Sequence, residues 1–247
     1  MFETSRPRHY HNETTRLSSE LPRRFGMFSW NVNKNGRLRD FARLFAEWER
    51  TWHLYLILLQ EARLRPQKPF LLPEWGYHFA ANLSVGGTRY GVLSASRAKS
   101  LEARAFLSGG KEAYVGPRKS LLLTRYALQG GGTLLCVNLH AINFRETARY
   151  RKELTAIYET IARYEGAMIV AGDFNSWNPA RLRSLWQFRE ALGLEIVEMD
   201  RKVKSFLGHP LDFIFYRGLR PIRAQILPHP DLSDHDPLLV EFEVLSG

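Results

Sequence analysis

Acidic, amide and imidazole side chains recur at the ends of apolar runs in this sequence. Five runs end in, or lead into, such groups, and a sixth run begins with an aspartate: WNVN (30–33), LLQE (58–61), VNLH (137–140), AGDFNSW (171–177), LSDHDP (232–237) and LDFIF (211–215). Because the ends of strands meet at one edge of a sheet, we expect these groups to form a single pocket. That pocket would combine carboxylates, amides and two histidines.

Oxygen-rich donors of this kind favour Mg²⁺ or Mn²⁺ over metals that prefer thiolate ligands. Magnesium usually binds one or two carboxylates, keeps several waters and completes its shell with phosphate oxygens of the substrate. The two histidines could supply a proton donor and a charged partner for a phosphate. Together with a basic surface, these groups predict cleavage of a phosphoester.

Each of these residues has a simpler explanation when it is considered alone. Asn31 could close the turn NKNG, Glu61 could be a solvated carboxylate, and His140 could be a core histidine. Aspartates in Asp-x-Asn and Ser-Asp-His segments often organise turns by binding backbone amides. The occurrence of the whole set in one chain favours the functional interpretation. The other histidines match no motif, and we expect surface or structural roles for His9, His11, His53, His78, His209 and His229.

The composition is that of a globular protein with a positive surface. The 247 residues include 35 Lys and Arg against 25 Asp and Glu, which gives a net charge of +10 and favours an anionic partner. We expect a flexible polar N-terminal segment over residues 1–22 and one domain over residues 23–247. No apolar run approaches the roughly 20 residues that cross a bilayer, which argues against an integral membrane protein.

The N-terminal segment and the cysteine content point to the cytoplasm. The first 25 residues are charged and polar without the apolar centre of a secretory signal. A lone cysteine, Cys136, excludes an internal disulfide and a multi-cysteine zinc site. It lies within the apolar run TLLCVNLH, so we expect a buried structural thiol.

Apolar runs predict many strands and few helices. The predicted strands are FGMFSWNV (25–32), LYLILLQ (54–60), YHFAANL, YGVLSAS, KSLLLTRYAL, TLLCVNLH, AMIVAG, LDFIFY and LLVEFEV. Helical spacing of apolar residues occurs over about 38–48, 145–165 and 180–191. This pattern predicts an α/β protein in which mixed sheets stack face to face with helices outside.

The ordered segments WNV, QE, NLH, GDFN, LDFIF and SDH resemble the endonuclease/exonuclease/phosphatase (DNase-I-like) superfamily of magnesium-dependent phosphohydrolases. The resemblance extends from about residue 25 to residue 243, and VNLHAINF, HPLDFIFYRGL and SDHDPLLVEF look most like the YafD-like bacterial branch. The resemblance implies a four-layered α/β sandwich, in which two packed mixed β-sheets are flanked by helices. We expect a monomer.

The resemblance also implies a role for each motif residue. Glu61 would be the main metal ligand, assisted by Asn31, with Asp234 near the metal. Asp173 would orient or deprotonate the attacking water, and Asn175 would hydrogen-bond the developing phosphorane oxygens.

Two histidines complete the implied machinery. His235 would contact the scissile phosphate or serve as acid or base, and Asp212 would pair with it and favour its protonated form. His140 would donate to the phosphate or protonate the leaving oxygen. Members of the superfamily often have an acid beside this second histidine, and Glu102 and Glu112 are candidates by position.

His140 also narrows the choice among the enzyme classes of this superfamily. Abasic-site endonucleases of the exonuclease type carry a tyrosine in a Y-x-P-x-G context at this stage of the chain, whereas this chain has NLHAIN. The histidine resembles the pattern of pancreatic-type deoxyribonucleases, sphingomyelinases, inositol-polyphosphate phosphatases and deadenylases. Abasic-site cleavage is therefore disfavoured.

Two interpretations are possible for the residues that could contact the substrate. Basic residues near the motifs could follow a phosphate backbone or lie on solvated surfaces: Arg89, Lys111, Arg118, Lys119, Arg145, Arg149, Arg181 and Arg183. Trp177 and Phe206 could stack on a base or pack at the rim of the site.

Three functions are compatible with the sequence. The +10 charge favours a nuclease acting on DNA or RNA over a hydrolase of a small headgroup. A phosphatase or phospholipase-type hydrolase of a lipid or inositol headgroup is the first alternative, although the expected hairpin LSGGKEAYVGPRKS is polar and basic rather than apolar. A non-catalytic nucleic-acid-binding module on the same fold is the second alternative.

Overall fold

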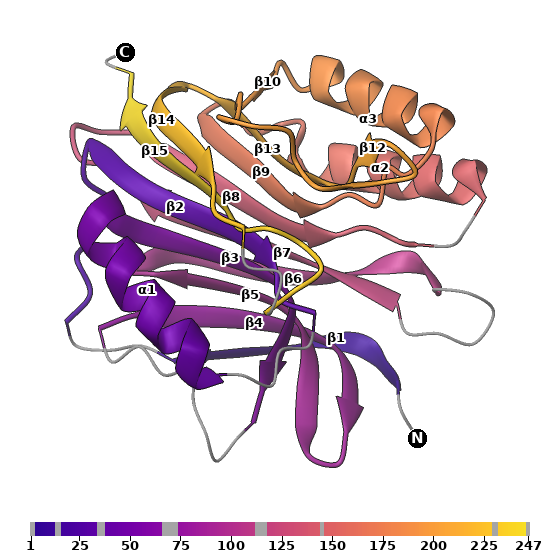
Figure 1. Ribbon diagram of the computed structural model, residues 1–247, viewed down its shortest axis with the longest axis horizontal. Helices are drawn as coiled ribbons and strands as arrows, with labels where there is room; N and C mark the ends of the chain where they lie inside the picture. Colours follow the sequence, from indigo (N-terminus) through magenta and orange to yellow (C-terminus); the bar gives the residue numbers. More distant parts are fainter. Residues whose placement is uncertain are drawn as a thin grey trace.

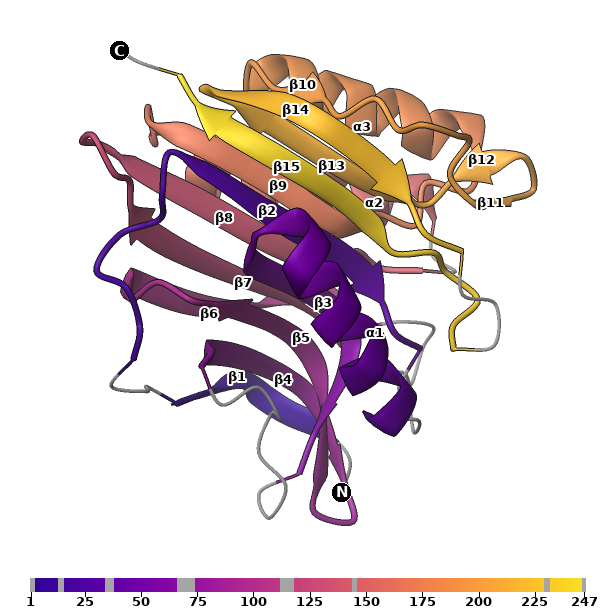
Figure 2. The ribbon, with the colours of Figure 1, turned by 60° about the vertical axis from the view of Figure 1, so that its left-hand side comes forward.

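The computed structural model describes residues 3–12, 16–33, 38–65, 74–111, 118–143, 146–228 and 232–245. Two large sheets lie face to face, and helices cover their outer faces (Figures 1 and 2). The sheets contain both parallel and antiparallel strand pairs, so each is a mixed sheet.

The first sheet has seven strands. Their spatial order is β1 (Glu3–Asn12), β4 (Gly76–Val85), β5 (Thr88–Ser96), β3 (Leu54–Leu64), β2 (Arg24–Asn31), β15 (Leu238–Val244) and β14 (Leu219–Ile226). The strands β2 and β3 run parallel because helix α1 (Leu38–Trp52) returns the chain to the same end of the sheet between them.

The second sheet has six strands. Their order is β10 (Glu195–Ile196), β13 (Asp212–Arg217), β9 (Ala167–Asp173), β8 (Thr133–His140), β7 (Arg118–Ala127) and β6 (Ser100–Lys111). The parallel pair β8 and β9 is joined through helix α2 (Thr147–Ile161), and helix α3 (Pro179–Ala191) follows β9. A small hairpin of β11 (Ser205–Phe206) and β12 (His209–Pro210) lies between β10 and β13 in the chain.

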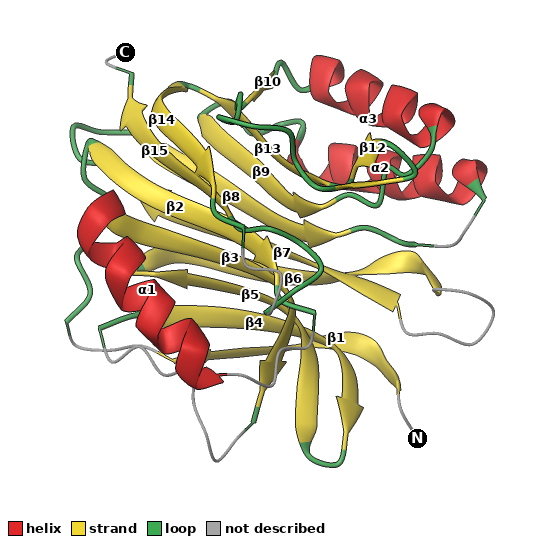
Figure 3. Ribbon diagram, in the orientation of Figure 1, coloured by secondary structure: helices red, strands yellow, loops and turns green. Residues whose placement is uncertain are grey.

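Three apolar clusters hold the layers together. Phe45, Trp48 and Trp52 of α1 pack on the outer face of the first sheet. Side chains such as Leu58 of β3 and Ile169 of β9 fill the space between the sheets. A third cluster joins α2 and α3 to the outer face of the second sheet. Helix, sheet, sheet and helices therefore form the predicted four-layered sandwich, as the secondary-structure colouring shows (Figure 3).

The N-terminal segment differs from the flexible polar tail expected over residues 1–22. Its strand β1 pairs antiparallel with β4 at the edge of the first sheet. Leu21 is fully buried between the sheets, and its amide donates to the carbonyl of Ala127 at 2.9 Å. An edge strand does not need the continuous apolar run of a central strand. The polar sequence of β1 therefore gave no strand signal.

The expected central strands and the three helices are confirmed, with shifts at their ends. Five further strands escaped prediction: β6, β10 and β14, which lie at sheet edges, and the two strands of the small hairpin, β11 and β12. Cys136 is buried, as expected. Within the described parts of the chain, no helix is both long and apolar enough to cross a membrane.

Candidate active site

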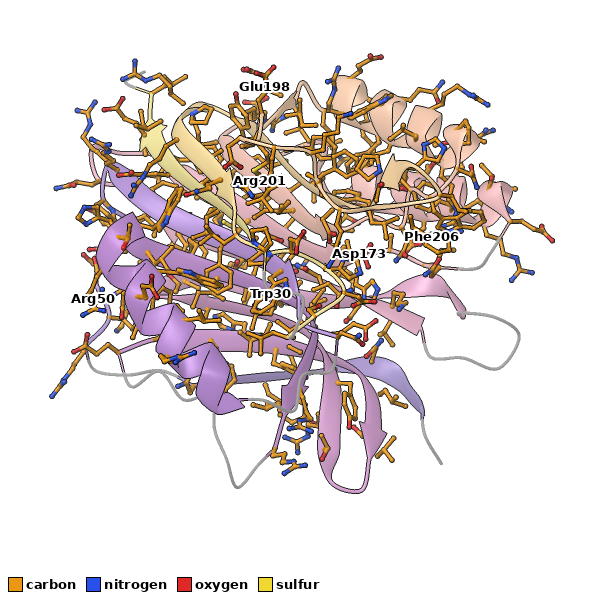
Figure 4. All side chains as sticks on the ribbon, in the orientation of Figure 1. Trp30, Arg50, Asp173, Glu198, Arg201 and Phe206 are labelled. Carbon is orange, nitrogen blue, oxygen red and sulfur yellow. The ribbon has the colours of Figure 1, made fainter. Side chains whose placement is uncertain are left out.

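The topology brings the motif residues to one edge of the sandwich. Asn31 ends β2, His140 ends β8 and Asp173 ends β9, while Glu61 lies near the end of β3. The two parallel pairs point their carboxyl ends to this edge. Asp212 begins the antiparallel strand β13 directly opposite Asp173, so it reaches the same place. In Figure 4, Asp173 lies where the edges of the two sheets face each other.

The backbone is unusual at two of these residues. Glu61 has φ of 50° within an irregular stretch of β3 between Leu59 and Ala62, and Asn175 has φ of 49°. Positive φ is uncommon for residues other than glycine, and it often marks functional positions. The irregularity turns Glu61 away from the regular alternation of its strand.

The structure explains why the GDFN motif begins with a glycine, Gly172. A Cβ atom at this position would lie 2.0 Å from the carbonyl oxygen of Leu139 in the neighbouring strand, and the backbone φ is 141°. Only glycine fits both restrictions without a shift of the strands. Asp173 therefore follows a residue that brings β8 and β9 close together.

The carboxylate of Asp173 is the centre of the site. Its Oδ2 atom lies 3.3 Å from Nε2 of His140 and 3.9 Å from Nε2 of His235. The amide of Asn31 donates to the same oxygen at 3.0 Å. Glu61 Oε1 lies 3.8 Å from His140 Nε2. Side chains from both sheets thus converge on one buried carboxylate.

Asn175 completes the hydrogen bonds of Asp173. Its backbone amide donates to Oδ1 of Asp173 at 2.9 Å, and its side-chain amide donates to the carbonyl of Ala141 at 2.9 Å. Burial alone would raise the pKa of Asp173. The hydrogen bond and charge of His140, the charge of His235 and the Asn175 amide outweigh burial and lower this pKa to about 2. Asp173 is therefore ionised throughout the neutral range.

His235 forms the predicted pair with Asp212. Its Nδ1 atom lies 2.6 Å from Oδ2 of Asp212. Burial opposes the charged form of His235, but the contact with Asp212 and the nearby carboxylates of Asp173 and Asp234 raise its pKa to about 10. The imidazole is a cation at neutral pH, with Nε2 turned toward Asp173.

The loop before β15 is fixed to the end of β2. The indole nitrogen of Trp30 donates to the carbonyl of His235 at 2.9 Å. Ser233 donates through its hydroxyl to the carbonyl of Asn31 at 2.6 Å and accepts from the amide of His235 at 3.1 Å. These bonds hold His235 beside Asn31, although 204 residues separate them in the sequence. Asp234, between Ser233 and His235, is exposed.

A buried polar layer that the sequence reasoning missed lies directly beneath the site. Gln60 of the first sheet donates to Oδ1 of Asn138 in the second sheet at 2.8 Å. Asn138 in turn donates to the carbonyl of Leu93 at 2.8 Å, which lies in the first sheet. Both side chains are fully buried, and they are the glutamine of QE and the asparagine of NLH. Their membership of these motifs was the only sequence signal for the layer.

The neighbour of His140 is a lysine. Nζ of Lys119 lies 3.0 Å from Nε2 of His140, and Lys119 is buried at the start of β7. Of the two acidic candidates for this place, Glu102 is exposed and pairs with Arg125 at 3.3 Å. Glu112, the other candidate, lies outside the described residues.

Arg181 is not the phosphate contact that we considered. It is fully buried, and its guanidinium donates to the carbonyls of Ile142 and Asn175 at 2.9 and 2.8 Å. The rings of Tyr150 and Trp177 lie 4.6 and 4.9 Å from it. Arg181 therefore joins the loop after His140 to the loop after Asp173.

The other predicted substrate contacts have different placements. Trp177 is half-buried against Arg181, and Arg89 of β5 lies over the ring of Tyr10 at 3.7 Å. Arg149 and Arg183 are exposed on α2 and α3. Phe206 is 48% exposed in the β11–β12 hairpin. Arg145 lies outside the described residues, as do the side chains of Lys111 and Arg118.

The donor set at this edge fits a hard divalent cation. Glu61 and Asp173 both lie within 4 Å of the same His140 nitrogen, so two carboxylates share a small space. A pair of carboxylates with open positions for water and phosphate is the usual protein contribution to a Mg²⁺ site. Within the described residues, no three His, Cys, Asp or Glu side chains converge as a metal cage.

Comparison with known proteins identifies the family. The family model described as "Endonuclease/Exonuclease/phosphatase family" matches residues 28–235, and the chain belongs to this family. A UPF0294 protein of Vibrio cholerae is 34% identical over 243 residues, which cover 96% of this chain and 83% of that protein. A UPF0294 protein of Yersinia enterocolitica is 47% identical over 128 residues, or 51% of this chain and 48% of that protein.

Solved structures of the family share the fold at low sequence identity. A humanized D. rerio TDP2 aligns with a TM-score of 0.68 at 18% identity, over 90% of this chain and 100% of that one. The human Nocturnin catalytic domain aligns with a TM-score of 0.67 at 15% identity, over 97% and 98%. D. rerio TDP2 complexed with a single-strand DNA product aligns with a TM-score of 0.66 at 17% identity, over 90% and 99%.

Proposed function

We propose that this protein is a phosphodiesterase that hydrolyses nucleic acid, DNA or RNA, with the aid of Mg²⁺ or Mn²⁺. The observation that carries the proposal is the buried Asp173 carboxylate between the Nε2 atoms of His140 and His235, at 3.3 and 3.9 Å. An anionic phosphodiester needs positive groups and a fixed acceptor for the attacking water, and this edge offers both. The cytoplasmic location and the monomeric state expected from the sequence are predictions of the same proposal.

Glu61 would be the principal ligand of the cation, with Asn31 and Asp234 beside it. The cation, when bound, supplies a positive charge for the phosphate oxygens and lowers the pKa of a bound water. Asn31 is already oriented, because its amide donates to Asp173 and its carbonyl oxygen accepts from the amide of Asn33 at 3.0 Å. Its placement next to Glu61 on paired strands β2 and β3 supports this role.

Asp173 and His235 have separate roles at the scissile phosphate in this proposal. Asp173, which is ionised at neutral pH, orients the attacking water by accepting its proton in a hydrogen bond. His235, which is cationic, donates from Nε2 to a phosphate oxygen as charge develops there. Asp212 fixes the orientation of His235 through Nδ1.

Asn175 and His140 complete the proposed machinery. Asn175 lies one residue beyond Phe174 in the GDFN motif and would hydrogen-bond the phosphorane oxygens. His140, with Lys119 3.0 Å from its Nε2 atom, would donate to the phosphate or to the leaving oxygen. Lys119 adds a positive charge beside His140, which suits an anionic leaving group.

Nucleic acid is the substrate that the charge favours. The net charge of +10 attracts a polyanion, and such binding weakens steeply as salt concentration rises. The related D. rerio TDP2 was solved with a single-strand DNA product. The similarity between the two folds supports nucleic acid as a substrate class for this chain.

The test is cleavage of labelled single-stranded DNA, duplex DNA, RNA, abasic and flap substrates in Mg²⁺, Mn²⁺ or EDTA. We expect cleavage in a divalent cation and none in EDTA. Asp173→Asn, which keeps the shape of the side chain, should reduce the rate on the order of 100- to 1,000-fold or more. Asp200→Asn, an aspartate outside the site, is a control for general effects of the substitution.

Two outcomes would contradict the proposal. If the folded protein cleaves none of these substrates in either cation, nuclease activity is excluded. If it binds them without cutting, and Asp173→Asn does not change binding, the chain is a non-catalytic nucleic-acid-binding module.

A second candidate function is hydrolysis of a phospholipid headgroup. The observation that favours it is the β11–β12 hairpin, in which Phe206 and Leu207 are 48% and 72% exposed. Lys202 and Lys204 precede them, and a basic apolar hairpin suits an anionic lipid surface. Turnover of a phospholipid panel without nucleic-acid cleavage would establish this function in place of the first.

A further inference from the structure

A cleft of about 420 Å³ opens beside His140, between the second sheet and helix α2. Its sheet wall comes from β6, β7 and β8, and its other wall comes from α2 and the loop that precedes this helix. The cleft is separate from the Asp173 centre, but His140 belongs to both. A group held in the cleft would therefore lie next to the bond that the site cleaves.

The cleft carries three cationic side chains. Lys119 lines it from β7, at 3.0 Å from His140, and Arg149 and Lys152 line it from α2. Arg149 and Lys152 are three residues apart on the helix, so they share one face. Both are exposed, and Lys119 is buried. The cations thus extend from the catalytic histidine to the solvent.

One acidic side chain, Glu153, lines the same cleft and is committed to the backbone. Its Oε2 atom accepts from the amide of Ile142 at 3.0 Å. Burial raises the pKa of Glu153 to about 7, so this group offsets only part of the positive charge at neutral pH. Among the lining residues the charge is therefore positive on balance.

The remaining walls are largely apolar. Phe106, Leu121, Ile142 and Ile157 line the cleft beneath the cations. A volume of this size is in the range of small-ligand pockets, which combine apolar walls with a few placed polar groups. Such walls suit the sugar and base that connect two neighbouring phosphates, and a bare inorganic anion would not need them.

We propose that this cleft binds the phosphate next to the scissile phosphate of a nucleic-acid strand, together with the nucleoside between them. Lys119, Arg149 and Lys152 would contact that second phosphate. This inference rests on the proposed function and specifies its substrate as a strand with at least two adjacent phosphates. A diester with a single phosphate would reach the catalytic residues without occupying the cleft.

The test compares two double variants that remove equal charge. Arg149→Gln with Lys152→Gln empties the mouth of the cleft of cations. Arg151→Gln with Arg163→Gln is the matched control, because both residues are exposed on or just after α2 and neither lines the cleft. All four substitutions are on the surface, so both variants should fold.

Binding is measured in EDTA with a fluorescent single-stranded trinucleotide, and cleavage is measured in Mg²⁺ with the trinucleotide and with bis(4-nitrophenyl) phosphate. The cleft variant should bind the trinucleotide about tenfold more weakly or worse, because two charge-assisted contacts are lost. Its slope of log Kd against log salt should be shallower by about 1. The control variant should change both quantities much less, and neither variant should alter kcat/KM for the single-phosphate diester.

Equal losses in the two double variants would overturn the inference, because overall charge alone would then explain them. An equal loss of activity on the single-phosphate diester would also overturn it. If the wild type cleaves neither substrate but its binding in EDTA still depends on Arg149 and Lys152, the cleft stands and the proposed function fails.

Discussion

His235 depends on Asp212 for its charge. The pair is made by one contact of 2.6 Å and, together with the charges of Asp173 and Asp234, it outweighs the burial that would otherwise favour the neutral imidazole. A group whose pKa is raised on folding contributes stability that is complete below its unfolded pKa, about 6.5 for histidine. This contribution is lost as the pH rises through the folded value of about 10.

Asp212→Asn should therefore move the alkaline limit of activity. In the wild type His235 keeps its proton to about pH 10, whereas in the variant its pKa should fall markedly, because burial is then opposed only by the charges of Asp173 and Asp234. We expect kcat/KM to fall above neutral pH in the variant, with a loss on the order of 100-fold at pH 8. The measurement is kcat/KM from pH 5 to 10. Glu243→Gln, which alters an exposed pair with Arg220, should keep the wild-type profile.

Arg181 acts on the site without reaching the substrate. It donates to carbonyl groups in the loops that follow His140 and Asp173, two proposed catalytic residues, and removal would leave these buried carbonyls without this donor. Arg181→Met should cost about 2–4 kcal/mol of unfolding free energy. It should also lower kcat about 10- to 100-fold with a smaller change in KM, because the loops lose their relative position.

Urea unfolding and steady-state kinetics would measure both effects of Arg181→Met. Arg183→Met is the matched control, since Arg183 is exposed on the same helix. Arg181→Lys should lie between Arg181→Met and the wild type, because a lysine can keep one of the two bonds. A variant with full activity and reduced stability would assign Arg181 to stability alone.

At the scale of elements, strand β1 is joined to the first sheet by stacked imidazoles. Nε2 of His9 lies 3.0 Å from Nδ1 of His78, whose Nε2 lies 2.7 Å from the hydroxyl of Ser100. His11 stacks on His78 with ring centroids 5.9 Å apart. Burial and the charges of His9 and His11 lower the pKa of His78 to about 4.

Docking of β1 should weaken in mild acid. When β1 is detached, His78 of β4 binds a proton near pH 6.5, whereas with β1 docked it resists protonation until about pH 4. The contribution to docking is therefore present above pH 6.5 and is lost as the pH falls from there to about 4. Hydrogen exchange of the β1 amides should be faster at pH 5 than at pH 7.5, after correction for intrinsic rates. His78→Gln should reduce this difference, while His53→Asn should not, because His53 is exposed and asparagine tolerates its φ of 46°.

At the scale of the whole molecule, the two sheets are connected by the polar layer of Gln60 and Asn138. The layer lies in an otherwise apolar interface, where a lost partner is costly. Asn138→Ala should cost about 2–4 kcal/mol by urea unfolding, since it removes the shortest hydrogen bond of Gln60 and the side-chain donor to the Leu93 carbonyl from a buried layer. A double-mutant cycle of Asn138→Ala and Gln60→Ala should give a coupling free energy of about 1 kcal/mol or more. Gln187→Ala is the control, and it should cost little stability because Gln187 is exposed on α3. If the stability losses of Asn138→Ala and Gln60→Ala simply add in the double variant, the two side chains are not directly connected.

The sequence predicted the interior of the fold better than its margins. Central strands such as β3 and β9 are buried on both faces and read as continuous apolar runs. The strands β1, β6 and β14 lie at sheet edges, where exposed polar residues interrupt such runs. Edge position therefore explains why these strands were not predicted.

In the candidate site, too, some positions could be predicted from the sequence and others could not. Residues at strand ends, such as Asp173 and His235, could be predicted to meet because the motifs and the topology are linked. Lys119 and Arg181 could only be listed as basic residues, because their distances to His140 and Asn175 depend on how long side chains fold back onto neighbouring loops. Sequence spacing does not determine that geometry.

The placement of β15 has a consequence during protein synthesis. This strand lies between β2 and β14, although it is made after all the other strands. His235 precedes β15 by three residues. Neither the cationic side chain of His235 nor the strand that supports it therefore exists until nearly the whole described chain has left the ribosome. A nascent chain that stops before residue 235 lacks both, so it cannot assemble the proposed catalytic edge. The proposed hydrolytic activity should therefore appear abruptly once residues 235–244 have left the ribosome, rather than growing with chain length.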